Sequence, residues 1–267
     1  MPLAQKQVIP PWQWPNVLGI DAAFISVLWQ GALASTIGVP LSLPAYLVLG
    51  CSVWLSYTAD RLFDVARRPS TALLSVRHRF AKRRRILLWR VWFGVLALNL
   101  ITATQLSSFQ LKQGSVLLLL CVLYTWLNQK LSRHYFPKEL CVALIYTGGI
   151  VVFLPEPPSL TFVFLFTYLC LLNCLMIGAK ETSVDAQLRI RSLASGLRAS
   201  YLSPLIWLGA IAAFFIETPL SGALTVSCIL LAILNAWRQH IAVEVFRVLA
   251  DGLLLIGPIL VLMDLTG

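Results

Sequence analysis

The chain has 267 residues and a formal net charge of +10, with 58% hydrophobic and only 12% charged residues. A mean hydropathy of +0.81 and this scarcity of charge exclude an ordinary water-soluble domain and indicate an all-α, polytopic integral membrane protein. The basic residues flank apolar segments and belong to no recognition motif, so we expect membrane lipid and not nucleic acid as their partner.

Nine apolar segments are long enough to form membrane-spanning helices, because a helix needs about 20 apolar residues to cross the hydrocarbon core. We expect them to form one domain over residues 1–267, a bundle of nine transmembrane helices around a central cavity. In chain order, the segments cover residues 17–38, 41–59, 86–105, 115–132, 139–155, 159–179, 200–216, 219–236 and 248–265.

The distribution of Lys and Arg gives an independent test of this count, since cytoplasmic loops collect basic residues. If the N-terminus is cytoplasmic, every Lys and Arg except Lys112 falls at the N-terminus, in a cytoplasmic loop or beside one. Loops on the other side, such as residues 155–158 and 217–219, are neutral or acidic. The sequence therefore predicts a multi-pass protein of a cell inner membrane or an organelle membrane, with its N-terminus on the cytoplasmic side.

Several common chemistries find no support in the sequence. His78, His134 and His240 stand alone, and there is no nucleophile elbow and no Gly-rich phosphate loop. The six cysteines all fall inside predicted spans, where free cysteine packs as a small apolar residue. Classical hydrolase, nucleotide-binding and zinc-binding functions are therefore not favoured.

Two pairs of acidic residues stand out among the 11 Asp and Glu residues of the chain. Asp60 and Asp64 are four residues apart, as are Glu181 and Asp185, and each pair lies where an apolar segment runs into basic sequence. On a helix, this spacing places both side chains on one face, one turn apart. Carboxylates at a membrane boundary cost free energy, so we expect each pair to serve a ligand, an ion or a proton.

Two interpretations of the acidic pairs remain open. In the structural one, neighbouring arginines neutralise the carboxylates; in the functional one, the pairs face each other and hold magnesium diphosphate. The pairs recur at the same depth, four predicted helices apart, and Ser56 and Asn173 extend the two stripes. Because Mg²⁺ is commonly held by one or two carboxylates plus substrate phosphates, this repetition favours the functional interpretation.

The two stripes resemble the Asp-rich motifs of the UbiA superfamily of intramembrane prenyltransferases, and the resemblance extends over nearly the whole chain. The family's first motif, N-x-x-x-D-x-x-x-D, resembles Ser56, Asp60 and Asp64 within SYTADRLFD, with Ser in place of Asn. Its second motif, D-x-x-x-D, is similar to Glu181 and Asp185 within KETSVDAQLRIRSLA, with Glu in place of Asp.

A third signature of the family, a Tyr-Ser/Thr pair followed by basic residues, resembles Tyr124 and Thr125 with Lys130, although this lysine lies later than the family's. The resemblance implies transfer of an isoprenoid group from an allylic prenyl diphosphate to an aromatic or otherwise lipophilic acceptor, with Mg²⁺ assisting ionisation of the diphosphate. It points to no obligate protein partner. The implied catalytic and metal-binding residues are Asp60, Asp64, Glu181 and Asp185, and the implied substrate-binding residues are Ser56, Arg67, Tyr124, Lys130, Asn173 and Arg189.

Two other functions remain open at this point. A terpene cyclase of the same family would use the allylic cation internally and need no acceptor. A non-catalytic relative could retain the fold as a scaffold or act as a carrier, although a transporter usually places its ionisable groups near the middle of the bilayer. Asp21 and Asp251, in the first and last predicted spans, could pair with a loop arginine or shape the acceptor pocket.

Overall fold

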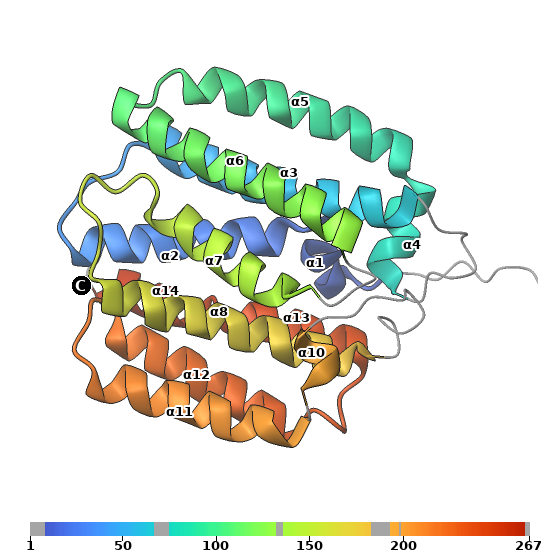
Figure 1. Cartoon of the computed structure of the whole chain (residues 1–267), viewed down its shortest axis with the longest axis vertical. Helices are drawn as coiled ribbons and strands as arrows, with labels where there is room; N and C mark the ends of the chain where they lie inside the picture. The colour runs from blue at the N-terminus through green and yellow to red at the C-terminus, as the bar shows by residue number, and fades with distance from the viewer. Residues whose placement is uncertain (1–8, 67–74, 132–135, 183–192, 198, 265–267) are drawn as a thin grey trace, which may run out of the picture.

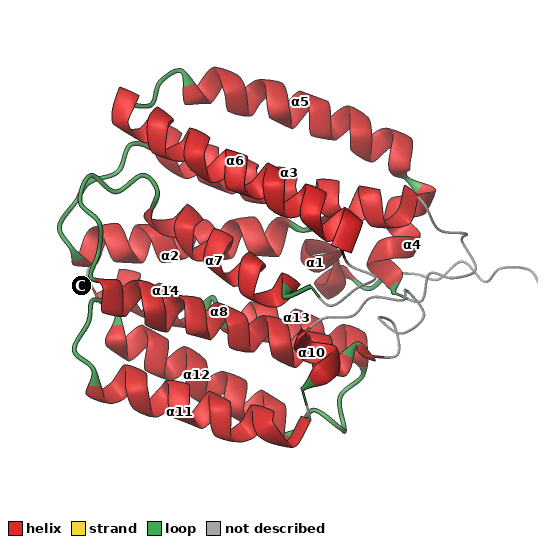
Figure 2. Ribbon diagram, viewed as in Figure 1, coloured by secondary structure: helices red, strands yellow, loops and turns green. Residues whose placement is uncertain are grey.

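The computed structural model describes residues 9–66, 75–131, 136–182, 193–197 and 199–264. Within these ranges every regular element is a helix, and Figure 2 shows only helices and the loops that join them. The long helices lie side by side in rows, and the long axes of neighbours run roughly parallel or antiparallel (Figure 1). The all-α prediction is therefore confirmed for the described part of the chain.

Each of the nine predicted apolar segments contains at least one helix. The segments with a single long helix correspond to α2, α3, α5, α6, α7, α8, α11 and α12, whereas the last segment holds parts of two helices. The bounds of these elements are α2 Ile20–Thr36, α3 Leu43–Ala66, α5 Arg85–Ala103, α6 Ser108–Leu131, α7 Lys138–Val151, α8 Leu160–Lys180, α11 Leu202–Phe215, α12 Ser221–Ala236, α13 Val243–Leu253 and α14 Ile256–Asp264.

Several short elements were not among the predicted segments, because each is too short or too polar to cross a bilayer. The most consequential is α4, which follows the loop after α3 and begins where the Ser75 side chain caps the backbone N–H of His78. The remaining short elements are η1 Pro11–Gln13, α1 Trp14–Leu18, α4 Val76–Arg83, α10 Leu193–Gly196 and η3 Ala199–Tyr201.

The largest hydrophobic core joins α2, α7, α8 and the C-terminal helices. Trp29 of α2 has no exposed surface, and its ring meets that of Phe166 of α8 at a centroid distance of 4.8 Å. Its indole N–H donates to the backbone carbonyl of Leu254 at 2.9 Å, so this buried polar group is satisfied. These contacts fix α8 at the centre of the bundle, between the N-terminal and C-terminal helices (Figure 1).

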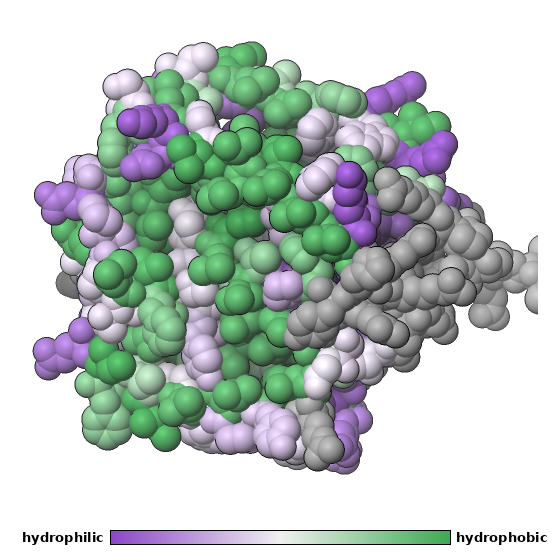
Figure 3. Space-filling view, viewed as in Figure 1, coloured by the Kyte–Doolittle hydropathy of each residue, from purple (hydrophilic) through white to green (hydrophobic). Residues whose placement is uncertain are grey.

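The outer helices α5 and α6 expose apolar side chains over much of their length. Phe93 is 60% exposed, Leu118 61% and Leu119 67%. No residue is buried within the most apolar 18-residue window of α6, and 11% of the corresponding window of α5 is buried. A continuous apolar surface of this kind, visible in Figure 3, needs a hydrocarbon environment, as expected for an integral membrane protein.

Fewer segments than the nine predicted meet the length and hydropathy needed to cross a membrane. Four described segments are long and apolar enough to cross a bilayer: Arg85–Ala103, Ser108–Leu131, Leu160–Lys180 and Val243–Asp264. A fifth is possible if the pair Pro11–Leu18 and Ile20–Thr36, bent by 77°, counts as one span. The structure thus supports a multi-span membrane protein but does not confirm nine spans.

The two ends of the bundle differ in composition. The C-terminal ends of α3, α6 and α8 lie at the same end of the bundle as α4 and α10 (Figure 1). The basic residues of α4 lie here, and so do both predicted acidic motifs as far as the structure describes them. This end of the bundle therefore holds the candidate functional site.

Candidate functional site

The first acidic motif lies on one helix, as predicted. Ser56, Asp60 and Asp64 occupy successive turns of α3, which ends at Ala66. The Ser56 hydroxyl donates to the carbonyl of Ser52 in the same helix at 2.9 Å, so this side chain is turned back onto its own backbone. One oxygen of Asp64 lies 4.0 Å from Nε2 of His78 in α4. The two carboxylates therefore lie one turn apart on α3, and Asp64 lies beside α4.

Asp60 is held from α6 by a residue that the sequence analysis missed. Asn128 Nδ2 donates to Oδ1 of Asp60 at 3.4 Å. Tyr124 lies one turn earlier on α6, and its ring stacks on Phe136 with centroids 6.2 Å apart. The four-residue spacing from Tyr124 could have identified Asn128 in the sequence, because it places both side chains on one face of α6.

Lys130, in contrast, faces away from Asn128. Residues two positions apart on a helix are separated by about 200° around its axis, so Lys130 lies on the other side of α6 from Asn128. Its ammonium group lies 4.2 Å from the ring centroid of Trp126, whose side chain is 52% exposed. The structure therefore does not place Lys130 on the face of α6 that contacts Asp60.

The second acidic motif begins at the end of α8, which ends at Lys180, one residue beyond the predicted segment 159–179, with Glu181 as its C-cap residue. Because Asp185 lies outside the described residues, its position on one face with Glu181 stays a prediction. The Glu181 N–H donates to the carbonyls of Ile177 and Gly178, which closes the last turn. Three predicted site residues, Arg67, Asp185 and Arg189, lie outside the described residues.

Glu181 is buried and paired with two arginines. One carboxylate oxygen lies 3.3 Å from a guanidinium nitrogen of Arg77 in α4, and the other forms an ion pair with Arg247 of α13. Arg247 is only 1% exposed, and its second terminal nitrogen donates to Glu244 at 2.8 Å. Glu244 also accepts from the N–H of Val76 at 3.1 Å. This chain of charges ties α4, α8 and α13 together.

A second polar network joins Asn173 to the two acids of the first and last predicted spans. Asn173 Nδ2 donates to Asp251 at 3.0 Å. The amide of Asn16 donates to Asp251 at 3.0 Å and to Asp21 at 2.7 Å, which links both carboxylates through one side chain. Arg61 of α3 donates to the carbonyls of Asn16 and Val17. Neither acid forms a direct pair with a loop arginine among the described residues.

The implied magnesium ion fits the first motif better than Glu181. Asp60 and Asp64 supply hard oxygen ligands one turn apart, which suit Mg²⁺. Both oxygens of Glu181, however, already face guanidinium groups, and a cation there would be repelled by two positive charges. Among the described residues, no group of three or more His, Cys, Asp or Glu side chains could hold a metal ion by itself.

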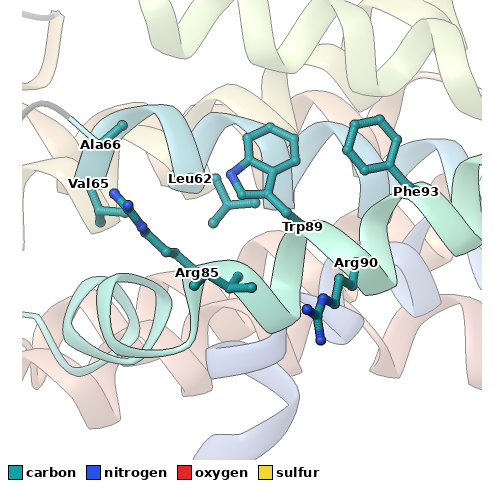
Figure 4. A pocket seen from close by; sticks show the side chains of 8 residues that line it. Leu62, Val65, Ala66, Arg85, Trp89, Arg90 and Phe93 are labelled. Atoms are coloured by element: carbon teal, nitrogen blue, oxygen red, sulfur yellow. The ribbon is translucent and has the colours of Figure 1, made fainter.

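A surface cavity of about 420 Å³ lies between α3 and the first half of α5. Figure 4 shows Trp89 of α5 beside Leu62 of α3, with Phe93 farther along α5 and Arg85 directed toward Val65 and Ala66. None of the predicted site residues lines this cavity, so it is separate from the acidic motifs. The lining residues are Leu62, Val65, Ala66, Arg85, Ile86, Trp89, Arg90 and Phe93.

The described geometry defines a class of protein: a helical membrane bundle with paired carboxylates and buried arginines at one end. Comparison with solved structures adds a fold: the chain is similar to the ligand-free structure of a UbiA homolog from Aeropyrum pernix K1, with a TM-score of 0.59. The match has 15% sequence identity and covers 92% of this chain and 98% of that chain. No family model matches the sequence, and no curated protein matches it. The chain therefore has the fold of a UbiA homolog.

Proposed function

We propose that the protein is an intramembrane prenyltransferase that moves an isoprenoid group from an allylic prenyl diphosphate to a lipophilic, aromatic or similar acceptor. The observation that carries the proposal is the coincidence of two features. The chain shares the fold of a UbiA homolog over 92% of its length, and its acidic motifs fall at one end of that fold.

The reaction requires stabilisation of diphosphate as it leaves, because the C–O bond ionises only if the departing charge is neutralised. Asp60 and Asp64 would hold magnesium, which supplies this neutralisation as a Lewis acid when bound. Asn128 fixes the orientation of Asp60 by donating to one of its oxygens. By sequence, Asp185 remains a further proposed ligand, and Arg67 and Arg189 remain proposed phosphate-binding residues.

The allylic cation needs a nearby π-face and protection from water. Among the aromatic residues near the first motif we favour Tyr124, because it lies one turn before Asn128, the α6 residue that contacts Asp60, and its ring stacks on Phe136. Phe63 and Trp126 are 39% and 52% exposed and face outward. We therefore propose that Tyr124 faces the reacting carbon, and that Asn173 lies toward the acceptor side with Asp251.

One alternative has support from a specific observation. The arginine pairs at Glu181 would equally stabilise a non-catalytic protein that retains the fold, because they neutralise the acid without a ligand. Such a protein would bind neither magnesium nor a prenyl diphosphate at this end of the bundle.

The test is turnover by the detergent-purified full chain with prenyl diphosphates of several lengths, in magnesium or in chelator, with and without a panel of lipophilic acceptors. A prenyltransferase releases diphosphate and forms a prenylated product only with magnesium and acceptor. A cyclic product formed without acceptor would replace the proposal with a terpene cyclase. No consumption of any prenyl diphosphate would favour the non-catalytic alternative.

A further inference from the structure

Arg77 lies beside the second acidic motif, at the end of the bundle that also carries the first. It belongs to α4, and its guanidinium group contacts Glu181 of the second motif at 3.3 Å. Through Glu181 it is linked to Arg247 of α13, which pairs with the other carboxylate oxygen. This network therefore joins α4, α8 and α13, which are far apart in the sequence.

The hydrogen-bonding of Arg77 is incomplete. Its Nε atom is buried, and among the described residues no acceptor lies opposite it. A buried N–H without a partner costs about 1–3 kcal/mol, more for a charged group, so such a donor points to an absent acceptor. The side chain as a whole keeps 23% of its surface exposed, so a ligand can reach it.

The carboxylate of Glu181 has the opposite property, since both of its oxygens are engaged. Arg77 takes one oxygen and Arg247 takes the other, while Glu244 holds Arg247 from the same helix. Glu181 therefore fixes the direction of the Arg77 guanidinium, and Arg247 prevents Glu181 from turning elsewhere. Arginine stays protonated at physiological pH, so Arg77 carries its positive charge whether or not a metal ion is bound.

We propose that Arg77 binds the diphosphate of the substrate directly, and that Glu181 and Arg247 are positioning residues that hold Arg77 rather than ligands of magnesium. This inference rests on the proposed function. It assigns the two motifs different tasks: Asp60 and Asp64 serve the metal, and Glu181 serves a guanidinium group. Guanidinium and phosphate form charge-assisted, often bidentate hydrogen bonds, so Arg77 suits a doubly charged phosphoryl group.

The test measures binding of a prenyl thiodiphosphate to the purified full chain while magnesium is titrated. Two quantities separate the roles: the magnesium concentration at half-maximal binding, and the Kd of the analogue at saturating magnesium. Asp60→Asn is expected to raise the magnesium midpoint about tenfold or more, as loss of a metal ligand should. Glu181→Gln is expected to leave this midpoint within about twofold and to raise the analogue Kd about tenfold, because Arg77 loses its anchor.

Two variants of Arg77 complete the experiment. Both leave the Glu181–Arg247 pair intact, so they test the inference even if Glu181→Gln folds poorly. Arg77→Met is expected to raise the analogue Kd about tenfold at saturating magnesium, and Arg77→Lys to restore part of the loss. The matched control is Arg83→Met, at an exposed position in the last turn of α4. Its Kd for the analogue is expected to be unchanged.

The outcomes distinguish this inference from the function on which it rests. If the unaltered protein does not bind the analogue with magnesium, the proposed function and this inference both fail. If it binds, but Arg77→Met binds equally well, only the inference fails. A magnesium midpoint that rises tenfold in Glu181→Gln, with unchanged Kd at saturation, would make Glu181 a metal ligand and overturn the positioning role.

Discussion

Asp60 and Glu181 occupy corresponding places in the two motifs, but their surroundings differ. Asp60 accepts one weak hydrogen bond from an uncharged amide, whereas Glu181 is held by two guanidinium groups. A carboxylate with free lone pairs is suited to a metal, and one that is fully paired is suited to holding its partners. This difference between two acidic residues is the basis of the roles assigned to them.

The role of Asn128 gives a prediction for turnover. Asn128→Leu removes the only hydrogen bond seen on Asp60 among the described residues, so the carboxylate loses its orientation. We expect kcat to fall about tenfold, equivalent to about 1.4 kcal/mol. Lys130→Met, two residues away and on the other side of α6, is expected to change kcat less than threefold, in the range of surface substitutions. Equal losses in both variants would contradict this assignment of the two faces.

The network around Asp251 gives a prediction for stability. Asn16 and Asn173 are 6% and 7% exposed, and both donate to Asp251. Asp251→Ala would leave two buried amides without this acceptor, and we expect a loss of about 2–4 kcal/mol. Thermal unfolding in detergent measures the loss, and the exposed Asp264→Ala, at the end of α14, is the control. A melting temperature unchanged in both variants would show that the network contributes no stability.

The residues predicted from sequence were those whose signal is local. Asp60 and Asp64 are visible as a spacing of four residues, and the structure confirms that they share α3. Arg77 and Arg247 were not singled out, because among so many basic residues at this membrane face nothing local marks them. Arg77 pairs with a residue 104 positions away, and Asn16 with one 235 positions away. Such partners depend on which helices pack together.

At the scale of helices, the existence of each predicted apolar segment as a helix could be read from its composition, because long apolar runs favour helices in lipid. Helix ends were predicted unevenly, since they depend on local caps: the predicted end of α8 is within one residue of Lys180, whereas α3 continues to Ala66, beyond the predicted residue 59. The C-cap at Glu181 and the Ser75 cap of α4 both fall within basic, polar sequence where hydropathy carries little information. The break after Leu253 likewise divides an apolar run that reads as one segment.

Close packing of α14 on α12 gives a prediction about a glycine. A Cβ atom at Gly257 would lie 2.7 Å from the backbone oxygen of Ala223 and 2.7 Å from Oγ of Ser227. Because the backbone oxygen cannot move aside cheaply, Gly257→Ala should push the two helices apart and cost about 1–3 kcal/mol.

The matched control for this substitution is Gly252→Ala in α13, where nothing lies within 4 Å of the added Cβ. Alanine favours helix over glycine, so this control should be neutral or slightly stabilising. Melting temperatures of the two variants in one detergent provide the comparison. A larger loss for Gly252→Ala than for Gly257→Ala would contradict the packing of α14 on α12.

At the scale of the whole molecule, the exposed apolar faces of α5 and α6 and the basic end near α4 suggest how the protein sits in a membrane. Since basic residues favour the cytoplasmic side, we predict that α4 is cytoplasmic and that the turn containing Glu156 is on the other side. Single cysteines at these places, Arg83→Cys and Glu156→Cys, would be introduced into a chain lacking the six native cysteines.

A membrane-impermeant maleimide applied to intact cells is expected to label Glu156→Cys at once and Arg83→Cys only after permeabilisation. The reverse pattern would place the N-terminus outside and invert the predicted orientation. Labelling of both sites in intact cells would mean that the two ends of the bundle are not on opposite sides of the membrane, contrary to the spans assumed for the helices between them.

The most direct test of the proposed function is binding of a non-hydrolysable prenyl thiodiphosphate to the detergent-purified protein, in magnesium and in chelator, beside the Asp60→Ala variant. We predict binding that requires magnesium and that weakens about tenfold or more in Asp60→Ala, since the variant lacks a proposed metal ligand. Binding that is the same with chelator, or the same in Asp60→Ala, would contradict a magnesium diphosphate site at the end of α3.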